Sequence, residues 1–445
     1  MADLSDINSA QAVKIIGSDT NGIEQDPVSS INGRLRVDAT ISPTNSFIGS
    51  VDIADGPNLD AFGRLRVSNP ESLFESTFQF DAQPLLWSSS LSGDGAVTHN
   101  ANTASVDFSV GTANGASVIY QTRQYFKYHP GKSQFVVFTG RLATPKANLR
   151  QRIGQFDEAN GVFFQVNGTT LSAVVRSSVS GSVVETTANQ ADWNLDKLDG
   201  TGASGITLDT ANQQIFLFDY QWLGSGRIRV GTIIGGRIVY AHEFNFANLI
   251  TTPYSQTGTL PLRVEITNTG ITASGSSGRL TCATIYSEGG FSPEGIARTG
   301  GSGVTLKTIG AAGKIPIVSI RKSASGIRIP VKIAGASVFC STSDDLLITF
   351  TVNATLTGST FATSIGFSQI DTAATTMSGG TEVYSFYLRG AAGIASEKLE
   401  DKFFELANLI LGSTIAGVSD IFTISATSLS GAANAAAMIN FRELS

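Results

Sequence analysis

Residues 155–186 read QFDEANGVFFQVNGTTLSAVVRSSVSGSVVET, and this stretch decides the fold. Two Asn-Gly pairs, Asn160-Gly161 and Asn167-Gly168, separate runs of β-branched and aromatic residues. Asn-Gly between such runs is the strongest short-range signal for a β-hairpin, because both residues tolerate the positive φ that a tight turn requires. A Ser/Gly turn over residues 177–182 leads into another apolar run. The stretch therefore predicts consecutive antiparallel strands within a large β-sandwich.

The composition favours the same fold class. Charged residues make up 15% of the 445 residues, whereas an ordinary soluble protein has roughly 25%. Ser, Thr, Asn, Ala and 47 glycines take their place, as is typical of β-rich proteins that work outside cells or in large assemblies. The 26 phenylalanines are spread through the apolar segments and are expected in a sandwich core.

The chain is predicted to be all-β, with four regions in order. Short apolar segments between turn signals indicate sandwiches or jelly rolls, and a Gly/Ser-rich stretch marks the boundary between two of them. Leu399, Phe403, Leu406 and Ile410 recur at helical spacing, which predicts one helix over residues 396–411. The regions are an extended N-terminal docking arm (1–72), a large jelly-roll or lectin-like β-sandwich (73–292), a Gly/Ser-rich linker (293–313) and a smaller C-terminal β-sandwich (314–445).

The N-terminal arm contains an internal repeat, NGRLRVD at residues 32–38 and FGRLRVS at residues 62–68. Leu and Val alternate with Arg in both copies, which predicts a strand with an apolar face and a basic face. An isolated short ribbon cannot bury its apolar face, so we expect both copies to dock on the body of the chain, a symmetry mate or a larger partner. The alternative is that the arginines are simply solvated. The predicted assembly residues are Arg34, Leu35, Arg36, Val37, Arg64, Leu65, Arg66 and Val67.

Several classes of partner are not expected. The net charge of −6 argues against nucleic-acid binding, which needs a basic surface. Cys282 and Cys340 fall in different predicted regions, so buried free thiols are expected instead of a disulfide. The first residues are acidic and carry no apolar run, so no secretory signal is predicted. No stretch approaches the ~18 apolar residues of a membrane helix, so membrane insertion is not expected.

Catalytic motifs do not stand out, and the chain is predicted to be neither an enzyme nor a cofactor protein. None of the three histidines has a His or Cys at metal-ligand spacing. Glycoside hydrolysis needs two carboxylates across a cleft, and sequence spacing does not say which acids meet. The candidate acids in the large sandwich are Asp157, Glu158, Glu185, Asp219, Glu243 and Glu265.

One polar loop, residues 192–200, is a candidate ligand site. Asp192, Asn194 and Asp196 match the first three ligand positions of a calcium loop, but the pattern then fails, because Lys197 stands where the turn needs Gly. Turn capping by these side chains is the favoured alternative. Trp193 lies in the same loop, where an exposed indole could stack on a sugar.

The sequence resembles a group of tailed-bacteriophage virion proteins over roughly residues 60–290. The resemblance implies a virion component made in the host cytoplasm, whose partners are other virion proteins. It does not imply a position in the particle. The segments that carry it are DAFGRLRVS (60–68), LFES (73–76), PGKSQ (130–134), GQFD (154–157), GVFF (161–164), ADWNLD (191–196), YAHEFN (240–245), LRVEI (262–266) and SEGG (287–290).

Three functional hypotheses follow from the sequence. The first is a non-enzymatic virion protein of the tail, baseplate or fibre attachment, or else a head decoration or head fibre. It is expected to assemble through its N-terminal arm, with a homotrimer favoured. The alternative is a carbohydrate-binding protein that recognises host-surface glycans through loops of the large sandwich. A polysaccharide depolymerase comes third, because it requires an acid pair that the sequence does not reveal.

Overall fold

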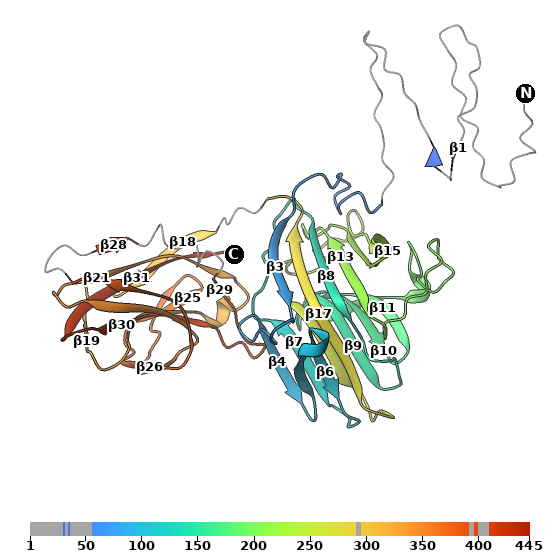
Figure 1. Cartoon of the computed structure of the whole chain (residues 1–445). Coiled ribbons are helices and arrows are strands. Elements are labelled where there is room, and N and C mark those ends of the chain that lie inside the picture. Colours follow the sequence, from blue (N-terminus) through green and yellow to red (C-terminus); the bar gives the residue numbers. More distant parts are fainter. Residues whose placement is uncertain (1–29, 32–33, 36–55, 291–294, 391–395, 399–408) are drawn as a thin grey trace, which may run out of the picture. The chain divides into compact units, whose positions relative to one another are not determined.

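The computed structural model describes residues 30–31, 34–35, 56–290, 295–390, 396–398 and 409–445 (Figure 1). The chain divides into two compact units, Met1–Ala54 and Asp55–Ser445, and each is described by itself. In the first unit, β1 (Ser30–Ile31) pairs antiparallel with β2 (Arg34–Leu35). The rest of the predicted arm up to residue 55, including Arg36 and Val37, lies outside the described residues.

The large sandwich consists of two antiparallel sheets. Its seven-stranded sheet has the order β12 (Val184–Asn189), β11 (Thr170–Ser177), β10 (Gly161–Asn167), β9 (Leu149–Phe156), β16 (Leu262–Asn268), β7 (Ser117–Thr122) and β4 (Trp87–Ser92). Its eight-stranded sheet has the order β15 (Arg237–Phe244), β14 (Ile228–Ile234), β13 (Gln214–Tyr220), β8 (Gln134–Arg141), β17 (Ser276–Ser287), β6 (Ser105–Val110) and β5 (Ala96–Asn100), with β3 (Glu71–Thr77) also paired to β17.

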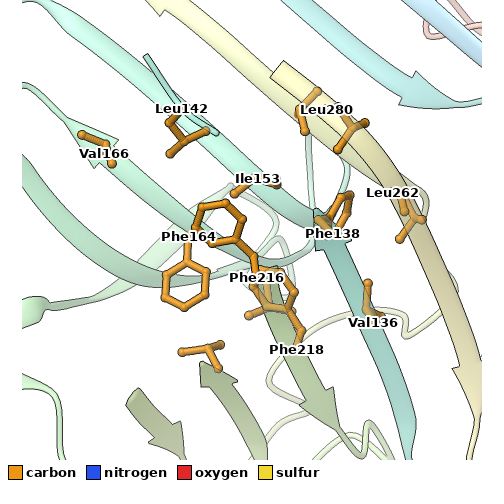
Figure 2. Close-up of a cluster of buried hydrophobic side chains, with 14 of the residues drawn as sticks. Val136, Phe138, Leu142, Ile153, Phe164, Val166, Phe216, Phe218, Leu262 and Leu280 are labelled. Carbon is orange, nitrogen blue, oxygen red and sulfur yellow. The ribbon is translucent and has the colours of Figure 1, made fainter. Parts of the chain in front are cut away.

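Phenylalanines from both sheets fill the space between them, as the composition predicts. Figure 2 shows Phe164 of β10 packed against Phe216 and Phe218 of β13, with Phe138 of β8 close by. The four side chains are fully buried. Successive strand residues point to opposite faces, so one side of each strand supplies the core and the other carries the polar groups described below.

The hairpins of residues 155–186 form as predicted, with a small shift in one turn. Asn167 of β10 lies opposite Thr170 of β11, so the turn residues are Gly168 and Thr169, one position later than expected. Gly168 has a φ of +63°, which glycine adopts without steric cost. β12 then pairs with β11 and forms one edge of the seven-stranded sheet.

The C-terminal residues form a second, smaller sandwich of two antiparallel sheets. One has the order β18 (Ile296–Gly301), β31 (Ala433–Glu443), β21 (Val331–Cys340) and β28 (Ser396–Lys398), with β19 (Lys307–Ile309) on β31 and β29 (Ile410–Leu411) on β21. The other has the order β24 (Thr363–Ile365), β25 (Ser368–Asp371), β20 (Ile315–Lys322), β30 (Ile421–Ser428), β22 (Leu346–Val352) and β27 (Thr381–Leu388). The short strands β23 (Thr355–Thr357) and β26 (Thr376–Ser378) pair separately. The predicted all-β class with a large and a small sandwich is thus confirmed.

Two predictions in this region need correction. Part of the expected linker, residues 293–313, is sheet, because β18 and β19 both pair with β31. Gly300 packs so closely that a Cβ there would lie 2.6 Å from Ile370 Cγ1, so this glycine serves packing and not chain flexibility. The expected helix over residues 396–411 is also wrong at both ends, where β28 and β29 pair with β21, and residues 399–408 lie outside the described part.

The two cysteines are both free thiols, Cys340 buried and Cys282 partly buried. Helical structure in the described residues is limited to short 3-10 turns at Ala101–Thr103, Gln190–Asp192 and Ala324–Gly326. In the same residues, no helix has the length and apolar character needed to cross a membrane.

Candidate functional site

The second Gly-Arg-Leu-Arg-Val copy folds as a tight hairpin on the large sandwich, not as the predicted strand. An isolated β-bridge between Leu59 and Leu65 closes the hairpin. Asp60 caps it, because its Oδ1 accepts a hydrogen bond of 2.9 Å from the backbone amide of Arg64 and its Oδ2 pairs with the Arg64 guanidinium at 2.7 Å. Residues 59–67 are called the docking hairpin below.

Arg66 fastens the docking hairpin to the eight-stranded sheet. Its Nη2 lies 2.6 Å from Asp219 Oδ2 in β13, and its Nη1 donates to Glu288, directly after β17. The same Asp219 oxygen accepts hydrogen bonds of 2.6 Å from Arg229 Nη2 and from the Tyr240 hydroxyl. The Asp219 side chain is fully buried and that of Arg229 is 1% exposed. Buried charges persist only when they are paired, so the network fixes the hairpin to β13, β14 and β15.

The charges in this network explain the pKa shifts of its members. Burial alone would lower the pKa of Arg66, but the opposing charges of Asp219 and Glu288, together with the interaction with Tyr240, outweigh it and raise the pKa. Burial raises the pKa of Glu288, with Asp219 adding to that effect and Arg66 opposing it. The Arg66 guanidinium therefore stays charged across the physiological pH range.

The orientation of the docking hairpin is the reverse of the predicted one. Leu65 is 47% exposed and Val67 is 84% exposed, whereas the Arg66 side chain is 17% exposed. The Arg66 guanidinium also lies over the Phe135 ring, 4.6 Å from its centroid. Arg66 is thus the largely buried side chain of this copy, whereas Leu65 and Val67 are open and the Arg64 side chain is 51% exposed. Arg66 is drawn inward because the carboxylates that bind it are themselves buried.

This orientation predicts opposite results for two neighbouring substitutions. Val67→Ser should change the free energy of unfolding by less than about 0.5 kcal/mol, because the side chain is already exposed. Arg66→Met should lower it by about 2 kcal/mol, because charge-assisted hydrogen bonds to two carboxylates are lost. Urea unfolding followed by tryptophan fluorescence measures both values. Equal effects, or a larger effect of Val67→Ser, would contradict the described orientation.

Trp193, the predicted sugar-stacking residue, lies in the core. It is 4% exposed, and its ring meets the Phe164 ring edge-on at 5.9 Å between centroids. Its Nε1 donates a hydrogen bond of 3.1 Å to the Ala188 carbonyl. An indole with both faces buried offers no stacking surface, so the expected exposed position is wrong.

The predicted calcium-loop residues bind backbone groups instead of converging. The Asn194 side chain bonds to both the amide and the carbonyl of Glu243, and the Asp196 oxygens accept from the amides of Leu198 and Ser204. Asp192 is exposed. In the described residues, no group of three His, Cys, Asp or Glu side chains is placed to hold a metal ion. Asp196 thus caps turns, as the favoured alternative predicts, whereas Asn194 binds the backbone of β15.

A second charged cluster covers the outer face of the seven-stranded sheet. Arg152 of β9 and Arg176 of β11 both pair with Glu185 of β12, at 3.1 and 2.7 Å, and Arg152 also lies 3.5 Å from Glu265 of β16. Both guanidinium groups stack on the Phe163 ring at 5.0 Å from its centroid. Burial, aided by the charge of a nearby arginine, lowers the pKa of Arg152 to about 10, so it remains charged at neutral pH.

All of the acids considered for glycoside hydrolysis are paired with arginines. Each of the six has an oxygen within 4.0 Å of a guanidinium nitrogen: Asp157, Glu158, Glu185, Asp219, Glu243 and Glu265. Burial raises the pKa of Asp157, but this carboxylate is fully enclosed and its Oδ1 caps the turn at Ala159 and Asn160. A fully enclosed acid cannot reach a glycosidic oxygen.

Arg229, Tyr240 and Glu288 were not predicted as part of this site. The available signal is a charged residue inside an otherwise apolar strand, as for Asp219 in QIFLFDY and Arg229 in IRVGTII. Such residues need buried partners, although the pattern does not say which ones.

Comparisons with known proteins find no matching family model and no matching curated protein. Among solved structures, the chain is similar to a legume lectin-like domain from Entamoeba histolytica, at 10% identity and a TM-score of 0.30, over 49% of this chain and 99% of that one. It is also similar to a glycosyl hydrolase family protein from Mycobacterium fortuitum, at 12% identity and a TM-score of 0.34, over 48% of this chain and 99% of that one. The Emp47p carbohydrate recognition domain matches at 10% identity and a TM-score of 0.30, over 49% of this chain and 97% of that one. These similarities assign neither a ligand nor an activity to the chain.

Proposed function

We propose that this protein is a non-enzymatic structural component of a tailed-phage virion that assembles through its N-terminal residues. The observation that carries the proposal is the Arg66 network, which holds the docking hairpin, near the start of Asp55–Ser445, on the eight-stranded sheet. The first Gly-Arg-Leu-Arg-Val copy lies in the N-terminal unit and supplies the assembly residues Arg34, Leu35, Arg36 and Val37.

The ion pairing of the six candidate acids supports a non-enzymatic role. A glycosidase needs one carboxyl group that donates a proton and a second, free carboxylate. In this chain the six candidate acids are ion-paired, and several of the arginines are buried on the sheet faces. Paired charges of this kind stiffen a scaffold and leave no exposed acid pair at these six positions.

Leu65 and Val67 extend the proposal to partner contacts. They lie beside the Arg66 anchor and expose apolar surface, whereas the arginine between them is buried. An apolar contact next to a fixed point suits a neighbouring virion subunit or a second copy of the chain, and a homotrimer is the favoured assembly.

Removal of residues 1–54 tests the assembly role. The full chain and the chain from Asp55, each carrying an affinity tag, would be supplied in the infected host, and particles would be purified by density gradient. We expect the full chain to copurify with particles and the shortened chain to be absent from them, although its tryptophan-monitored unfolding is unchanged. Equal incorporation of both chains would rule out assembly through the arm, and absence of both would rule out a virion protein. Native mass spectrometry of the full chain tests the trimer.

A further inference from the structure

A hollow of about 520 Å³ opens at one end of the large sandwich, and the proposed assembly role does not use it. It lies between the residues that follow β8 and the segment that leads into β17. Its polar lining comes from Arg141, Thr144, Lys146, Ser274, Ser276 and Ser277, and the other lining residues are alanine and glycine. The short side chains leave the space between the polar groups open.

The two cations of the hollow are held in place by one loop. Lys146 Nζ donates hydrogen bonds to the carbonyl and hydroxyl oxygens of Ser274, at 3.1 and 2.9 Å, and to the Gly275 carbonyl at 2.9 Å. Arg141 Nη1 contacts the Ser277 carbonyl at 3.4 Å. Both cations thus contact the segment 274–277 and line the same hollow.

Neither of these two cations forms an ion pair with a carboxylate in the described residues. Their hydrogen-bond partners are neutral oxygens, and no carboxylate is among the described residues that line the hollow. Asp107 acts on Arg141 only at longer range, because its two oxygens bind Arg279 at 2.6 and 3.1 Å. Arg66, Arg152 and Arg229, by contrast, each pair with a carboxylate. Two cations that line one hollow without an ion-paired carboxylate favour the binding of an anion there.

A buried hydroxyl gives a second, independent observation. Ser276 is 6% exposed, and its Oγ has no hydrogen-bond partner in the described part of the chain. Buried polar atoms are nearly always hydrogen-bonded, so an orphan hydroxyl beside a hollow indicates a missing partner. An oxyanion can accept from this hydroxyl once its side chain rotates toward the hollow. The three donors of Lys146 are already used by Ser274 and Gly275, so Lys146 contributes its charge and Arg141 can contribute hydrogen bonds.

We propose that this hollow binds an oxyanion: a carboxylate, phosphate or sulfate group, either as a free ion or on an acidic saccharide. Lys146 and Arg141 supply the charge, and the hydroxyls of Thr144 and the serines supply neutral donors for oxygen atoms. The inference does not depend on where the protein stands in a particle.

Titration calorimetry of the full chain with inorganic phosphate, at constant ionic strength in chloride, tests the site. We expect saturable binding that is at least tenfold weaker in Lys146→Met. Lys197→Met is the matched control, since it removes the same charge from an exposed loop residue elsewhere on the sandwich, and it should bind phosphate as the wild type does. Arg141→Gln is the second variant, because Arg141 makes one long contact to the loop and its loss should weaken binding without unfolding the segment.

Two saccharide probes distinguish the sources of the oxyanion. Tighter binding of trigalacturonate than of phosphate, with no binding of neutral maltotriose, would assign the site to acidic saccharides. Binding of phosphate alone would assign it to a free ion. The proposal is overturned if neither phosphate nor trigalacturonate binds, or if Lys146→Met and Lys197→Met bind them equally. Particle incorporation of Lys146→Met is expected to be normal, so failure here leaves the assembly proposal standing.

Discussion

Replacing Asp219 with asparagine is expected to lower the free energy of unfolding of the large sandwich by about 4 kcal/mol. Asp219 Oδ2 accepts hydrogen bonds of 2.6 Å from Arg66, Arg229 and Tyr240. Asparagine removes the negative charge that pairs with the 1% exposed Arg229 and with Arg66. Removal of one partner from a buried ion pair costs far more than the pair contributes, because a buried charge remains uncompensated.

Urea unfolding followed by tryptophan fluorescence measures this loss. The three tryptophans of the chain, Trp87, Trp193 and Trp222, all lie in the large sandwich. The matched control is Asp107→Asn, which breaks a pair with Arg279 whose side chains are 22% and 23% exposed, and it should cost about 1 kcal/mol or less. A loss for Asp219→Asn no greater than that of the control would mean that the network contributes little to the fold.

Hairpins of the large sandwich could be predicted from the sequence because their signals are local. Asn-Gly pairs and period-2 alternation act over fewer than ten residues. The strands β10 and β11 form at the positions that these two signals predict. The turn still moved by one residue to Gly168-Thr169, since the final register is set by which side chains the neighbouring strands bury.

The docking hairpin shows where local reasoning fails. Alternation in Gly63–Val67 gives two faces but not the one that is buried, and apolar residues are the ordinary choice. Here Asp219 and Glu288, 153 and 222 residues away from Arg66, make the arginine the buried side chain. Nothing in the repeat itself carries that information.

The predictions that Trp193 is exposed and that Gly300 lies in a linker were wrong for a related reason. A polar loop around Trp193 predicts exposure, yet the core of the large sandwich reaches to this loop through Phe164. Glycines around Gly300 predict a linker, yet the close approach of Ile370 requires a residue without a side chain. In both cases tertiary packing decided the role of a residue whose sequence neighbours indicated a loop.

A substitution of Lys322, in the C-terminal sandwich, is expected to have the second large effect on stability. The residue is 2% exposed, and its Nζ donates a hydrogen bond of 2.6 Å to the Ile327 carbonyl, with no ion-pair partner in the described residues. Burial lowers its pKa from 10.5 to about 7, with Arg123 adding to that effect and Asp420 opposing it. The unfolded chain therefore holds this proton between pH 7 and 10.5 and the folded chain does not, so stability rises with pH across that window. At pH 7 and below, the full cost of the buried charge is about 5 kcal/mol.

Lys322→Met should therefore stabilise the C-terminal sandwich by about 2–3 kcal/mol at pH 7, because it removes the buried charge but leaves the Ile327 carbonyl without its donor. It should also flatten the rise in stability between pH 7 and 10.5. Scanning calorimetry at several pH values measures both effects. Lys314→Met, a partly exposed lysine paired with Glu382, is the matched control and should change stability by about 0.5 kcal/mol or less. A destabilised Lys322→Met with an unchanged pH slope would show that the charged lysine is satisfied in the folded protein. A stabilised Lys322→Met with a flatter pH dependence would show that the buried amine of Lys322 destabilises the folded protein.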